Sequence, residues 1–117
     1  MSVTISGGKL RRITRLAGSD GRFRMMAIDQ RGSMQKAIQS ATGEEATYEQ
    51  VAKMKTMITR ILSPNSTAVL TDPIFGYPYS IMDVPRDVGL LLAFEESGYV
   101  GDGVGENERA SVQIENW

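Results

Sequence analysis

Three short apolar segments, each ending in polar or turn residues, constrain the fold of this chain more than any other feature. They occupy residues 23–28, 68–71 and 89–94. A long helical pattern lies between the first two, and only a short connection separates the second from the third. Short, nearly continuous apolar strands joined by helical crossovers are typical of a parallel sheet covered by helices. The order of the segments therefore predicts an α/β fold.

The strongest helix prediction covers residues 48–62. Thr47 and Gln50 have the spacing of a capping box, in which two side chains satisfy backbone N–H groups at the helix start. Ser63 precedes Pro64 and should end the helix, because the residue before a proline avoids helical dihedrals. One helix face is apolar, with Lys53 and Lys55 away from it, and its members are Val51, Met54, Ile58, Ile61 and Leu62.

Three weaker patterns flank these elements. Apolar residues at three-residue spacing predict a short helix over residues 8–17, and a second short helix should run from Met34 to near Gly43. Residues 97–108 are glycine-rich and acidic, which predicts a mobile loop.

The composition excludes several classes of protein. The chain has 117 residues, enough for one packed domain, and its 13 basic and 14 acidic residues give a net charge of −1. This balance offers no excess of positive charge for a nucleic-acid backbone. No apolar run approaches the roughly 20 residues that cross a bilayer, and the N-terminus lacks the pattern of a secretory signal. We therefore expect a soluble, cytoplasmic protein with no nucleic-acid or membrane partner.

The chain contains neither cysteine nor histidine. A disulfide framework, a thiolate nucleophile and a Ser-His-Asp triad are thus excluded for this segment. Histidine is also the only side chain that titrates near neutral pH without a perturbed pKa. Any chemistry must use carboxylates, lysine, tyrosine, hydroxyl groups or a metal held by oxygen ligands.

Each of the three predicted strands is followed by a carboxylate: Asp29, Asp72 and Glu95. In parallel α/β folds the functional groups gather at the carboxyl ends of the strands. We therefore expect the three carboxylates to contribute to one polar site. Because Mg²⁺ needs only one or two carboxylates and otherwise keeps its water, a magnesium site is the chemical rival to a mechanism based on lysine.

The segment MAIDQRG at residues 26–32 resembles the first-strand signature of the class I aldolase superfamily that includes the tagatose-bisphosphate and sulfofructosephosphate aldolases. The likeness continues through LTDPIFG at residues 70–76 and GLLLAFE at residues 89–95. It covers most of residues 12–100, in the same order and with similar spacing. The AIDQR core is fairly specific, whereas each of the other segments is weak alone.

The resemblance implies a (β/α)₈ TIM barrel, a fold of about 250 residues. Residues 1–117 would then form an incomplete barrel domain, its N-terminal portion of about three strands. The resemblance also places the Schiff-base lysine beyond Trp117. The chain's own lysines are predicted on helices or in the N-terminal arm, where they lack the desolvation that activates an amine, and they are Lys9, Lys36, Lys53 and Lys55.

In the intact enzyme, the implied reaction cleaves a phosphorylated ketose into dihydroxyacetone phosphate and an aldehyde, without a cofactor or a metal. The fragment alone is expected to be inactive. By resemblance, Asp29 is the catalytic candidate and would contact substrate hydroxyls, with Gln30 and Arg31 as substrate-binding neighbours. Asp72 and Glu95 are substrate-binding candidates from their strand-tip positions. A turn-capping role for Asp29 and a structural ion pair for Arg31 remain as alternatives.

A second interpretation is a complete small doubly wound α/β domain that acts as a binding or signalling module with an acidic strand-tip site. That fold needs about five strands, and the sequence predicts three. The sequence does not identify the sugar among related ketose phosphates. It also leaves open whether the protein is a homo-oligomer.

Overall fold

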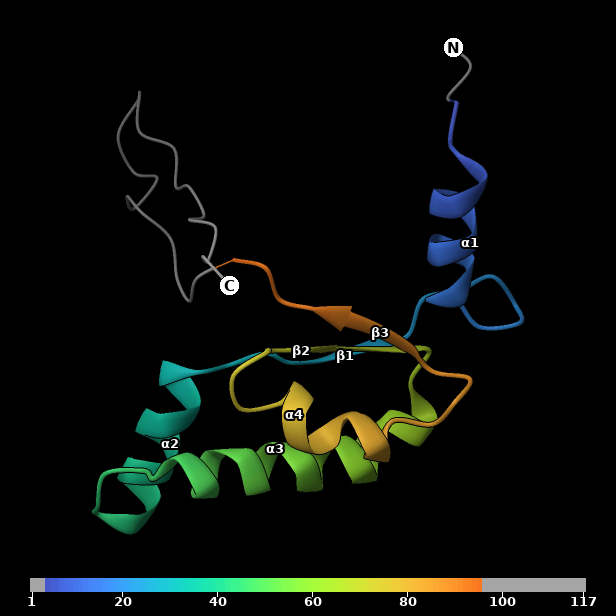
Figure 1. The fold of residues 1–117 in the computed structure, drawn as a ribbon. Helices are drawn as coiled ribbons and strands as arrows, with labels where there is room; N and C mark the ends of the chain where they lie inside the picture. The colour runs from blue at the N-terminus through green and yellow to red at the C-terminus, as the bar shows by residue number, and fades with distance from the viewer. Residues whose placement is uncertain (1–3, 96–117) are drawn as a thin grey trace, which may run out of the picture.

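The computed structural model of the chain describes residues 4–95 and contains a parallel sheet with helices against one face (Figure 1). The strands are β1 (Met25–Ile28), β2 (Ala68–Thr71) and β3 (Gly89–Leu92), in the spatial order β1-β2-β3. Both pairings are parallel, as the sequence predicts. Residues 97–108, where we expect a loop, lie outside the described residues.

The helices complete an α/β arrangement. The α-helices are α1 (Gly7–Arg15), α2 (Gly32–Thr42), α3 (Tyr48–Leu62) and the short α4 (Tyr77–Ser80), with 3₁₀ turns η1 (Ser63–Asn65) and η2 (Ile81–Asp83). Helices α2, α3 and α4 lie on the same side of the sheet, whereas α1 stands beyond the starts of the strands (Figure 1). Within residues 4–95, β1 and β3 are the two edges of the sheet. This arrangement is consistent with part of a TIM barrel.

Helix α3 has the predicted bounds, but its C-terminal end has a different cause. The capping box is present: Gln50 N donates to Thr47 Oγ1 at 3.2 Å, and Thr47 N donates to Gln50 Oε1 at 2.8 Å. Ser63 keeps helical dihedrals (φ −60°, ψ −32°) although it precedes Pro64. The α-helix therefore ends by tightening into the turn η1, and the expected avoidance of helical dihedrals before proline is wrong here.

The buried face of α3 also differs from the predicted one. Its buried residues are Val51, Ala52, Lys55 and Thr59. Met54 and Ile61, which the apolar pattern places in the core, are 41% and 66% exposed. The face that contacts the sheet thus carries a lysine, and this lysine determines how the strand ends are held together.

The core lies between the sheet and the helices as two clusters of buried side chains. One joins α2, α3 and the loop after β2, and consists of Ile38, Ala46, Val51 and Phe75. The other joins β1, β2 and the segment before β3, and consists of Ile28, Val69 and Val88. Met34 packs against both clusters. These apolar contacts pack α2 and α3 against one face of the sheet.

Gly76 closes the turn after β2 and has no room for a side chain. A Cβ atom there would lie 2.0 Å from Thr71 Oγ1 and 3.1 Å from Asp72 Oδ2. We expect Gly76→Ala to lower the free energy of unfolding by about 1–3 kcal/mol, because the buried Thr71 must move. Urea denaturation measures this loss. Gly32→Ala is the matched control, since nothing lies within 4 Å of its Cβ position; equal losses in the two variants would contradict the steric explanation.

Candidate functional site at the carboxyl ends of the strands

The carboxyl ends of β1 and β2 lie side by side at the same level. Ile28 pairs with Thr71, and Thr71 pairs with Leu92. Asp29 and Asp72 therefore follow their strands at matching positions. Glu95 comes further along its strand exit, after Ala93 and Phe94. The sheet thus brings the first two predicted carboxylates together and places the third beyond them.

A buried lysine links these two strand ends. Lys55 extends from α3, and its Nζ atom donates to Asp72 Oδ2 at 2.5 Å and to the backbone oxygen of Ile28 at 2.7 Å. The side chains of Lys55 and Asp72 are both 0% exposed. We call Lys55 and Asp72 the buried pair. Its ammonium group holds the last residue of β1 and the first residue after β2 in one place.

The second carboxylate oxygen of Asp72 organises the following turn. Asp72 Oδ1 accepts hydrogen bonds from the backbone N–H groups of Ile74, at 3.0 Å, and Phe75, at 2.7 Å. Both oxygens of Asp72 are therefore engaged within the protein. The predicted contact between Asp72 and a substrate finds no support in this geometry.

Burial lowers the pKa of the Lys55 amine below its usual 10.5, while the hydrogen bond and the charge of Asp72 oppose the shift. The charge of Asp29 also raises this pKa, and that of Arg31 lowers it. The expectation that all lysines are exposed is wrong for Lys55. Its buried Nζ atom is nevertheless held by two internal acceptors, so Lys55 is not placed to form the imine that the family resemblance implies.

Arg31 joins the end of β1 to the exit of β3. Its side chain is only 8% exposed, and its Nη2 atom donates to the backbone oxygen of Glu95. The Glu95 carboxylate accepts from the backbone N–H of Phe94 at 3.1 Å. Asp29 is partly exposed and Gln30 is exposed. The loop after β1 is thus held from both sides, by Lys55 at its start and by Arg31 at its end.

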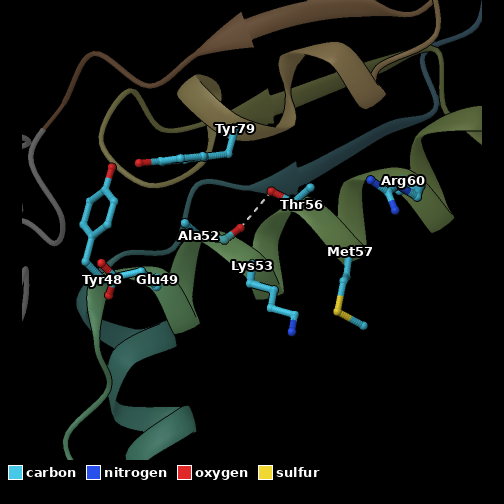
Figure 2. Close-up of a pocket in the computed structure, with 8 residues that line it drawn as sticks. All are labelled: Tyr48, Glu49, Ala52, Lys53, Thr56, Met57, Arg60 and Tyr79. Atoms are coloured by element: carbon cyan, nitrogen blue, oxygen red, sulfur yellow. Dashed lines mark hydrogen bonds between the residues drawn. The ribbon is translucent and has the colours of Figure 1, made fainter.

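The described residues also carry a hollow of about 440 Å³ that is separate from the strand ends. It lies between α3 and Tyr79 of α4, as Figure 2 shows. Its lining contains none of the predicted site residues; it consists of Tyr48, Glu49, Ala52, Lys53, Thr56, Met57, Arg60 and Tyr79. The hollow therefore belongs to the helical layer and not to the candidate site.

Residues 4–95 contain neither a cluster of metal-ligating side chains nor a membrane-spanning helix. No three acidic, histidine or cysteine side chains gather in a way that could hold a metal ion. Across the same part of the chain, every helix is too short or too polar to span a membrane. The three strand-end carboxylates therefore do not form such a metal-ligating group.

Comparison with known proteins gives consistent matches. The model of the DeoC/LacD family aldolases matches residues 23–115. Tagatose 1,6-diphosphate aldolase 2 of Enterococcus faecalis is 36% identical over 97 residues, and that of Streptococcus pyogenes is 32% identical over 99. Tagatose 1,6-diphosphate aldolase of Staphylococcus haemolyticus is 34% identical over 97. These alignments cover 83–85% of this chain but only 29–30% of the relatives' lengths.

Proposed function

This chain belongs to the DeoC/LacD aldolase family, and from that premise we propose that it forms the N-terminal part of a class I aldolase that cleaves a phosphorylated ketose. The relatives are named for tagatose 1,6-diphosphate, so that sugar is the first substrate to test. The supporting observation is the pair of strand ends, at which a partly exposed Asp29 directly follows Ile28, whose backbone oxygen accepts a hydrogen bond from the buried Lys55.

The proposed reaction needs an amine from a later part of the protein. That lysine forms an imine with the substrate ketone, cleavage of the carbon–carbon bond releases an aldehyde, and protonation of the remaining enamine leads to dihydroxyacetone phosphate. Asp29 accepts hydrogen bonds from sugar hydroxyls beside the imine, and Gln30 lies next to it on the exposed side of the loop. In this proposal Glu95 lines the rim of the same site.

The 117 residues alone are proposed to be inactive. The described sheet has two edges, and Leu90 and Leu92 on its edge strand β3 are 36% and 48% exposed. Such edges and apolar side chains call for further strands and helices. Lys55 is enclosed, and Lys53 on the same helix is exposed to water, where an amine keeps little nucleophilic character at neutral pH.

Borohydride trapping tests this proposal. We expect the 117-residue chain, incubated with tagatose 1,6-bisphosphate and borohydride, to give no covalent adduct by mass spectrometry. The longer protein that contains this chain should give one adduct, on a lysine after residue 117, and should release dihydroxyacetone phosphate. An adduct on Lys55 or Lys53 would overturn the assignment, as would a longer protein that neither forms an adduct nor cleaves any ketose phosphate.

A further inference from the structure

The buried pair does more than stabilise the fold: we propose that Lys55 is a positioning residue that sets the backbone at the end of β1 and thereby aims Asp29 at the substrate. This inference rests on the proposed function of Asp29. It assigns a role to a residue that neither the strand-end pattern nor the family resemblance identifies.

Lys55 Nζ has two acceptors, one on each strand end. An ammonium group that only neutralised Asp72 could complete its hydrogen bonds with any nearby oxygen. Lys55 Nζ instead donates to the backbone oxygen of Ile28, the residue that directly precedes Asp29. The peptide plane that carries this oxygen also carries the N–H of Asp29, because the atoms between two consecutive Cα positions are coplanar. Fixing the oxygen therefore restricts the orientation of Asp29.

Asp72, which holds the other side of the Lys55 ammonium group, is itself fixed. Asp72 holds Lys55 through Oδ2 and the turn after β2 through Oδ1, which accepts from Ile74 and Phe75. Gly76 packs closely against Thr71 and Asp72, so the carboxylate has little freedom to move. Lys55 thus transfers the rigid geometry at the end of β2 to the end of β1.

The other end of the loop after β1 is held by Arg31. Arg31 contacts the backbone oxygen of Glu95 at the exit of β3. The residues between Ile28 and Arg31 are consequently tied to the exits of β2 and β3. Within this loop Asp29 and Gln30 keep exposed surface, whereas Arg31 is buried. A short loop with fixed ends and a polar, accessible middle is suited to present a side chain in one orientation.

The test uses the double variant Lys55→Met/Asp72→Asn of the longer protein. Methionine keeps the length of the lysine side chain without its charge, and asparagine keeps an oxygen for the N–H groups of Ile74 and Phe75. Removing both partners leaves no uncompensated buried charge, so the variant should fold. Its link to Ile28 is nevertheless lost. We expect kcat for ketose phosphate cleavage to fall by about 10²-fold, the scale of a misplacement of about 1 Å, while the melting temperature stays close to that of the parent protein.

A double-mutant cycle with Asp29→Asn separates positioning from a general structural defect. If Lys55 acts through Asp29, adding Asp29→Asn to the double variant should reduce kcat by less than about 3-fold, because misaligned Asp29 has little left to contribute. Additive losses would overturn the proposal. Lys53→Met is the matched control, since this exposed lysine lies on the same helix and should leave kcat unchanged.

A crystal structure of the double variant tests the inference independently of activity. We expect the backbone of residues 28–31 to shift or lose order while the strands superpose on the parent structure. An unchanged loop would refute the positioning role even if kcat falls. If Asp29→Asn alone leaves full activity and the loop of the double variant shifts, Lys55 still positions the loop and the proposed function of Asp29 is the part that fails.

Discussion

Asp29→Asn in the longer protein is expected to reduce turnover of a ketose phosphate by about 10²-fold or more, the scale typical of a positioned charged or proton-transferring group. The substitution keeps the size and shape of the side chain and removes its negative charge. Because Asp29 is partly exposed and lies outside β1, the melting temperature should change little. Steady-state kinetics together with a melting curve measure both effects.

The matched control for this substitution is Asp87→Asn. Asp87 is an exposed carboxylate near the start of β3, at the opposite end of the sheet from Asp29. It should change neither turnover nor melting. Near-normal turnover with a lowered melting temperature in Asp29→Asn would instead identify Asp29 as a cap of the turn after β1, and its catalytic role would be wrong.

Lys55→Met alone is expected to lower the free energy of unfolding by about 3–5 kcal/mol, because it leaves the carboxylate of Asp72 buried without its partner. The double variant Lys55→Met/Asp72→Asn should recover most of this loss. Urea denaturation with linear extrapolation gives the three free energies. Lys53→Met should stay within about 0.5 kcal/mol of the parent protein, as is usual for an exposed side chain. Similar stabilities of Lys55→Met and Lys53→Met would contradict the prediction, because they would show that the carboxylate of Asp72 can stay buried without its partner at no cost.

The sequence alone predicts much of the framework. The apolar segments locate all three described strands, and the capping box at Thr47 locates the start of α3, since both signals depend on neighbouring residues. The end of α3 is also correctly located, but for a different reason. Ser63 keeps helical dihedrals although it precedes Pro64, and the chain continues into the 3₁₀ turn η1. Local patterns thus suffice for the positions of the three strands and of α3, whereas they do not predict the short α4.

The buried face of α3 could not be predicted in the same way. Apolar periodicity selects Met54 and Ile61, yet the sheet packs against a stripe at four-residue spacing, formed by Val51, Lys55 and Thr59. Burial of Lys55 is favourable only because Asp72 and a strand-end carbonyl group meet it, and these partners come from distant parts of the sequence. The four-residue spacing of Val51, Lys55 and Thr59 places them on one face of α3. That this face is the buried one follows only when the strand ends are known to pack against it.

The two contacts of Lys55 join residues that are close in the sequence, and this closeness affects the order in which the protein folds. Lys55 lies 17 positions from Asp72 and 27 from Ile28, so its contacts close small chain loops at a modest entropic cost. Contacts of this kind favour rapid folding, and a nascent chain folds from its N-terminal side as it is synthesised. β1 and β2 can therefore acquire their mutual register from β1, β2 and the helices between them. Strands that form later would pair with a sheet edge whose register is already set.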